Sequence, residues 1–242
     1  MIIKVSGENI REELLKNLPI QQQHPHLDDI IKVVELLHPG IDLKIFRVNF
    51  LDSDACKPMI TPLPEINQPV LLQFGPSFHN RSESDVSVAV AVHEFLSLKH
   101  LDKVTDLMKE LSKKRDELNS RDLGDEEYNR EFDKFQNEYE RKGVLADKCR
   151  RKMFVDADAF QFYLDNNLDP EDYKKFLEID RDLYLKFIES EEANKAWEIA
   201  WNWRIKFISD CISQSKSLDV EDYIDLMKSE LKEHYMRGLK ET

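Results

Sequence analysis

A buried helix is predicted by residues 190–211, which read SEEANKAWEIAWNWRIKFISDC. Ser190 is a residue type that caps helix N-termini, and the two glutamates after it suit the positive end of the helix dipole. The apolar residues then recur three or four positions apart, as on one helical face: Ala193, Ala196, Trp197, Ala200, Trp201, Phe207, Ile208 and Cys211. Ile199, Trp203 and Ile205 add a second apolar face, so we expect this helix to be the most buried one.

Two further helices are predicted on either side of this segment. Residues 169–172 read Asp-Pro-Glu-Asp, which is an N-cap, a proline at the first helical position and acids in the first turn. A last helix is expected over residues 220–237, ended by Gly238. Asp180 falls within an apolar stripe and Arg204 has a comparable position in the next helix, so a buried Asp180–Arg204 ion pair is our structural hypothesis.

An antiparallel helical hairpin is predicted between about residues 100 and 142. Its two apolar stripes have heptad-like spacing and consist of Leu101, Val104, Met108, Leu111 and Leu118, then Tyr128, Phe132, Phe135 and Tyr139. Arg115 interrupts the first stripe, and a turn at 122–124 joins the arms. The first arm is expected to continue a long helix that begins near Ser84. The stripes could pair within one chain or between two, so a homodimer through this hairpin is a further hypothesis.

The N-terminal region has a different composition. Residues 1–97 hold 8 basic and 13 acidic side chains, whereas residues 98–242 hold 27 and 35, and eight of the nine prolines precede residue 77. Strands are expected at 2–5, 41–50 and 70–74, helices at 8–18 and 28–37, and a proline-rich loop at 57–69. We therefore predict an α+β protein: a small mixed α/β head, residues 1–97, and a helical body with the hairpin, residues 98–242.

Composition excludes several classes of function. The chain has 242 residues, 35 Lys+Arg against 48 Asp+Glu and a net charge of −13, so nucleic-acid binding is an unfavourable interpretation. Its glycines form no Gly-x-Gly pattern, so no phosphate-binding loop and no cofactor is predicted. No apolar run is long enough to span a bilayer. Three widely spaced cysteines favour a reducing, cytoplasmic compartment, or alternatively a host cytosol.

The sharpest enzymatic hypothesis is a cysteine nucleophile. Cys56 follows a predicted strand in a polar loop, and His79 follows another, so the histidine could act as the base. Asp52, Asp54 or Asn80 could orient that imidazole, and Asp54 completes the candidate set. Two nearby aspartates, however, raise rather than lower the pKa of a thiol, so an ordinary loop cysteine is the competing interpretation.

No metal site is predicted. His93-Glu94 resembles the start of a His-Glu-x-x-His zinc helix, but position 97 is Ser97 and the next histidine is His100. Trp197, Trp201 and Trp203 could form an aromatic cage or a stacking platform, but their helical spacing favours core packing, at least for Trp197 and Trp201. The basic run at 148–152 is expected to be a solvated helical face.

Two functional classes remain open. In the first, the protein is an interaction module or adaptor that binds another protein through its hairpin, since helical hairpins offer long surfaces for a helix or a groove. Its composition also fits a bacterial effector or a phage-type regulator. In the second, it is a diverged cysteine-dependent hydrolase or transferase acting on a protein, with Cys56 as nucleophile.

Overall fold

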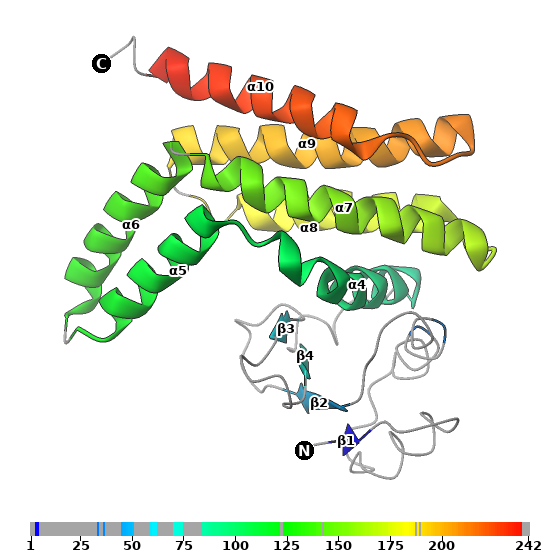
Figure 1. Cartoon of the computed structure of the whole chain (residues 1–242), viewed down its shortest axis with the longest axis horizontal. Coiled ribbons are helices and arrows are strands. Elements are labelled where there is room, and N and C mark those ends of the chain that lie inside the picture. Colours follow the sequence, from blue (N-terminus) through cyan, green and yellow to red (C-terminus); the bar gives the residue numbers. More distant parts are fainter. Residues whose placement is uncertain are drawn as a thin grey trace. The chain divides into compact units, whose positions relative to one another are not determined.

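The computed structural model describes four short strands, Val33 and Leu36, and residues 84–238 apart from 122, 142, 187 and 189 (Figure 1). The chain forms two compact units, Met1–Lys99 and His100–Thr242. Each unit is considered by itself below.

The described strands of the first unit form one sheet. They are β1 (Ile3–Lys4), β2 (Ile45–Phe50), β3 (Met59–Thr61) and β4 (Val70–Phe74), in the order β1-β2-β4-β3. Strand β2 pairs parallel to β4, with Phe46 opposite Val70, and the other two pairings are antiparallel. The prediction that 57–69 is only a loop was wrong, because β3 lies within it. The helices predicted at 8–18 and 28–37 lie outside the described residues except at Val33 and Leu36, so the mixed α/β head stays a prediction.

Helix α4 (Ser84–Ser97) is the described helix of the first unit. Its residues 89–93 are buried without interruption, as expected for a helix covered on every side. The prediction of one long helix from Ser84 into the hairpin was wrong. A 3₁₀ segment, η3 (Leu98–Lys103), follows α4, and His100 within it has non-helical dihedrals of φ −110° and ψ 24°. Thr105 then starts a new helix, because its hydroxyl accepts a hydrogen bond from the Met108 backbone N–H at 3.3 Å.

The second unit begins with the hairpin. Helix α5 (Asp106–Asn119) packs against α6 (Asp125–Arg141), and the Tyr128 hydroxyl donates to the Asn119 side-chain oxygen at 2.6 Å near the turn. Leu111, Tyr139 and Val144 form a small core that joins this hairpin to the next helix. Leu101 and Val104, which were predicted in the first stripe, precede α5. Gly143 then turns the chain at φ +97°, a conformation that favours glycine.

Four longer helices complete the second unit: α7 (Val144–Asp165), α8 (Pro170–Leu185), α9 (Glu191–Gln214) and α10 (Val220–Gly238). The predicted caps are confirmed, since Asp169 accepts from the Glu171 N–H and Ser190 accepts from the Ala193 N–H. Helix α9 contacts α7, α8 and α10 and lies beside them in Figure 1. Its buried residues number nine, however, against ten in α7, so α9 is not the most buried helix.

The helical character of the C-terminal part is confirmed. The described residues from 84 to 238 form seven α-helices, α4–α10. Helix α7 was missed as an element, because its buried residues do not keep to one stripe: Val144, Leu145, Cys149, Met153, Val155, Asp156, Ala159, Phe160, Phe162 and Tyr163. Among the residues that the structure describes, no helix is long and apolar enough to cross a membrane.

A buried ion pair lies at the centre of this bundle, but it is not the predicted one. Arg204 on α9 donates from Nε and Nη2 to the two carboxylate oxygens of Asp156 on α7, at 2.7 and 2.8 Å. The Tyr173 hydroxyl on α8 donates to the same carboxylate at 2.8 Å. Asp156 and Arg204 are only 0% and 1% exposed, whereas Asp180 is half-buried on α8. The expected Asp180–Arg204 pair was therefore wrong, because α7, which was not anticipated, supplies the carboxylate.

Burial and the Asp156 carboxylate together set the pKa values in this cluster. Burial alone lowers the pKa of Arg204, but the charge and hydrogen bonds of Asp156 outweigh it, and the pKa is raised. Burial, and then the neighbouring Asp156, raise the pKa of Tyr173 well above its ordinary value. Burial also raises the pKa of the Cys149 thiol to about 11, against the opposing charge of Lys152. The arginine is thus held charged, and the phenol and thiol are held neutral, at physiological pH.

Candidate functional site

A groove separates the hairpin from the rest of the second unit. It has a volume of about 700 Å³, and its walls come from α5 and α6 on one side and from α7, α8, α9 and the α8–α9 connection on the other. Its described lining residues are Met108, Leu111, Ser112, Arg115, Asn129, Phe132, Asp133, Phe135, Gln136, Lys148, Tyr184, Ile188, Ser190, Ala193 and Trp197. Apolar and aromatic side chains alternate in this lining with a few polar and charged ones.

Aromatic rings stand on both walls of the groove. On the hairpin, the rings of Phe132 and Phe135 meet edge to face with centroids 5.1 Å apart, and both residues are half-buried. On the opposite wall, Tyr184 contacts Trp197 at a centroid distance of 4.7 Å. Trp197 is 7% exposed, so it forms the floor of the groove and part of the core at once. The expectation that Trp197 and Trp201 pack in the core is confirmed.

Three charged side chains line the groove. Arg115 on α5 and Lys148 on α7 are basic, and Asp133 on α6 is acidic. Arg115 is exposed and makes no ion pair with the described residues, although the chain as a whole carries a charge of −13. The described lining thus holds two basic side chains and one acidic one, on a chain that is acidic overall. The arginine that interrupts the apolar stripe in the sequence lies at this surface.

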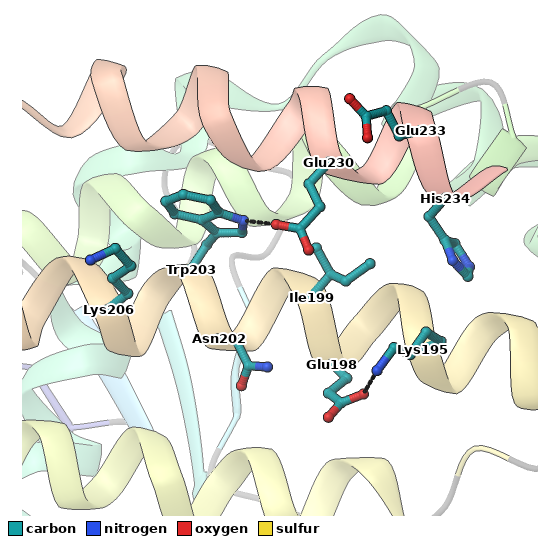
Figure 2. Close-up of a pocket in the computed structure, with 9 residues that line it drawn as sticks. All are labelled: Lys195, Glu198, Ile199, Asn202, Trp203, Lys206, Glu230, Glu233 and His234. Atoms are coloured by element: carbon teal, nitrogen blue, oxygen red, sulfur yellow. Dashed lines mark hydrogen bonds and ion pairs between the residues drawn. The ribbon is translucent and has the colours of Figure 1, made fainter. Parts of the chain in front are cut away.

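A second pocket lies between α9 and α10 and has a volume of about 390 Å³ (Figure 2). Many of its polar groups already have hydrogen-bond partners, either in the pocket or beside it. The Trp203 indole donates to Glu230 at 2.7 Å, Lys195 donates to Glu198 at 2.7 Å, and the His234 imidazole bonds the Glu192 carbonyl at 3.1 Å. The hydrogen bond and the charge of Glu198 raise the pKa of Lys195. Because these groups already have partners and carry charges of both signs, this pocket is a weaker candidate than the groove.

The residues predicted from the sequence as a catalytic site lie outside the described residues. This holds for Cys56, His79 and Asp54, and for Asp52 and Asn80 as well. The cysteine-enzyme hypothesis therefore stays a prediction. The other two cysteines, Cys149 and Cys211, are buried and free.

The two histidines considered for a metal site, His93 and His100, make different contacts. His93 is buried in α4, and its carbonyl accepts from the Ser97 hydroxyl at 2.8 Å. His100 in η3 lies 3.3 Å from the Asp158 carboxylate and stacks on Phe154. Within the described part of the chain, no group of three or more His, Cys, Asp and Glu side chains could hold a metal ion.

The basic run at 148–152 is not simply a solvated face. Lys148 lines the groove, and Lys152 lies 5.2 Å from the centre of the Trp201 ring. Arg150 bonds Glu221 of α10 at 3.1 Å and lies over the ring of Phe154. The run therefore connects α7 to its neighbours, which sequence spacing alone did not indicate.

Sequence reasoning missed the groove because its walls come from segments far apart in the chain. Phe132 and Phe135 were placed in the hairpin stripe as partners of the other arm, and Trp197 was placed in the core. The one local signal was Arg115, a charge within an apolar stripe. In comparisons with known proteins, the chain matched no protein-family model, no curated protein and no solved structure.

Proposed function

We propose that this protein is an interaction module that binds a partner protein in the groove between hairpin α5–α6 and helices α7–α9. The observation that carries the proposal is the pair of aromatic walls, Phe132 with Phe135 and Tyr184 with Trp197, on either side of a groove of about 700 Å³. Aromatic side chains in partly desolvated pockets are the residues that contribute most binding energy at protein interfaces.

The construction of the two walls supports this role. The bundle wall is anchored in the core through Trp197, so it offers a preorganised surface that loses little conformational entropy on binding. The hairpin wall has few buried side chains of its own, with Leu111 and Leu118 in α5. Phe132 and Phe135 are half-buried, with Phe135 packed against the small core of Leu111, Tyr139 and Val144, so both rings can bury further surface when the groove is filled. The suggestion of a bacterial effector or phage-type regulator stays a prediction.

Site-specific photo-crosslinking tests the proposal. Benzoylphenylalanine is placed at Phe132 in the groove and, as the control, at Lys134, an exposed residue of α6 outside the groove lining. The full-length protein is crosslinked in the cells that produce it, and a protein captured at position 132 but not at 134 is identified and purified.

The decisive measurement is the affinity for that purified partner. Phe132→Ala is expected to raise Kd by at least about tenfold, because it truncates an aromatic side chain of the interface. A tenfold rise in Kd corresponds to a loss of about 1.4 kcal/mol of binding free energy. Lys134→Ala is expected to leave Kd within about twofold of wild type. Equal capture at both positions, or an unchanged Kd for Phe132→Ala, would contradict the proposal.

A further inference from the structure

We infer that the occupant of the groove is an amphipathic α-helix of the partner protein that carries carboxylates beside its apolar face. This inference rests on the function proposed above and specifies the chemistry of the partner. It follows from the shape of the groove, its apolar lining and the sign of its charges.

The walls favour a helix over other peptide conformations. All described lining residues come from helices or from the α8–α9 connection, so the groove offers no sheet edge to which a strand could add. A helix presents apolar side chains at positions i, i+3 or i+4, and i+7 along one stripe. Such a stripe can contact Phe132 and Phe135 on one wall and Tyr184 and Trp197 on the other. A volume of about 700 Å³ accommodates the anchoring side chains of one helix, not a folded domain.

The charges select an acidic helix. Arg115 and Lys148 outnumber Asp133 in the lining, and Arg115 makes no ion pair with any described residue. A guanidinium can bind a carboxylate with two parallel hydrogen bonds, which fixes the register of a docked helix as well as adding affinity. On a chain whose net charge is −13, the exposed Arg115 is therefore a local point of attraction for a carboxylate of the partner.

A displayed library of helical peptides tests the inference on the full-length protein. Binders are selected on wild type and depleted on Ser112→Trp, which fills the groove from an exposed position of α5. The expected binders carry apolar residues at helical spacing and are enriched in Asp and Glu. The best peptide is then synthesised, and its Kd is measured at low and high salt.

Two charge reversals on the same helix separate local from general electrostatics. Arg115→Glu should raise Kd by about tenfold or more at low salt. Replacing the acidic residue of the peptide with lysine should restore binding to this variant. Lys113→Glu makes the same change of charge at an exposed position of α5 outside the lining, and it should alter Kd by less than about threefold. Arg115→Gln repeats the test if Arg115→Glu does not fold.

The outcomes distinguish this inference from the proposed function. The inference of an acidic helix is wrong if the groove-dependent peptides are not enriched in Asp and Glu. It is also wrong if Arg115→Glu and Lys113→Glu change Kd equally. Neither result contradicts the proposed interaction module. Failure to find any binder sensitive to Ser112→Trp would count against both. If sedimentation shows a dimer of the wild type that Ser112→Trp dissociates, the occupant is a second copy of this chain, and the inferred partner helix is wrong.

Discussion

The hairpin and the helical bundle of the second unit differ in what holds them together. Helices α7 and α9 bury ten and nine residues respectively, including the Asp156–Arg204 pair, and they contact each other and both neighbouring helices. Helix α5 buries only Leu111 and Leu118, and its side-chain bonds are mainly exposed contacts three residues apart, such as Lys109–Asp106. Exposed pairs of this kind contribute little stability.

This difference indicates a division of roles. A bundle that is closely packed around a charged core supplies stability and a rigid wall, whereas the hairpin supplies a wall whose aromatic side chains are only partly covered. Changes in the bundle should therefore affect the free energy of unfolding, and changes on the hairpin should affect binding. The four predictions below test the stability side of this comparison.

The largest effect is expected at the buried ion pair. Arg204→Met leaves the Asp156 carboxylate buried without its cation, which should lower the free energy of unfolding by about 3–5 kcal/mol, measured by urea denaturation. The double variant Asp156→Leu with Arg204→Met should recover much of this loss, because no buried charge remains. Arg115→Met in the hairpin should change the free energy of unfolding by less than about 0.5 kcal/mol. Equal losses for Arg204→Met and Arg115→Met would break the comparison.

Alkaline pH should weaken the bundle next. The folded-state pKa values of Tyr173 and Cys149 are raised, so the native state holds these protons more tightly than the unfolded state. Their contribution is therefore complete below the ordinary values of 10.0 and 9.0 and is lost as the pH rises above them. Each group can contribute a slope of up to about 1.4 kcal/mol per pH unit.

Urea denaturation between pH 7 and 11 measures this slope. Tyr173→Phe should cost about 1 kcal/mol at pH 7, because a buried hydrogen bond to Asp156 is lost, but it should make the decline above pH 10 shallower. Tyr128→Phe in the hairpin is the matched control, since its hydroxyl bonds Asn119 at an exposed position. If the free energy of unfolding falls equally steeply above pH 10 in Tyr173→Phe and in wild type, the Tyr173 phenol does not cause the decline.

The joint between hairpin and bundle gives a smaller effect. Gly143 has φ +97°, and Gly124 in the hairpin turn does not have positive φ, although a Cβ at either position would meet no atom within 4 Å. Gly143→Ala should therefore lower the free energy of unfolding by about 1–2 kcal/mol, because alanine is strained in this backbone conformation. Gly124→Ala should stay within about 0.5 kcal/mol of wild type. Similar thermal melts for the two variants would show that the joint carries no strain.

The smallest effect is expected at a helix cap. Ser190→Ala removes the hydroxyl that accepts from the Ala193 N–H at 3.3 Å and should cost about 1 kcal/mol in chemical denaturation. Ser190→Asp should restore the cap and add a favourable charge at the N-terminus of α9. A stability of Ser190→Asp as low as that of Ser190→Ala would show that this cap does not stabilise α9.

Particular residues show where sequence reasoning succeeded and where it failed. Asp169 and Ser190 identified the starts of α8 and α9, because a cap depends on bonds within two or three residues of itself. The long helix from Ser84 was wrong because α4 ends at Ser97 and the chain breaks at His100 before Thr105 caps a new helix. The candidate residues Cys56, His79 and Asp54 lie outside the described part of the chain, so that site stays a prediction. The groove was not foreseen, because aromatic spacing within α6 is the same whether the rings face a core or a ligand.

The sequence by itself determined that the C-terminal part is predominantly helical, where α8 and α9 begin, and that Trp197 and Trp201 are buried. Each of these depends on periodicity or on neighbours within one helical turn. Only the tertiary structure decided that Arg204 pairs with Asp156 rather than with Asp180, and that Arg115 and Lys148 line one groove with four aromatic rings. Those outcomes depend on how each helix is rotated about its axis and on which helix lies beside it, and local spacing does not encode either.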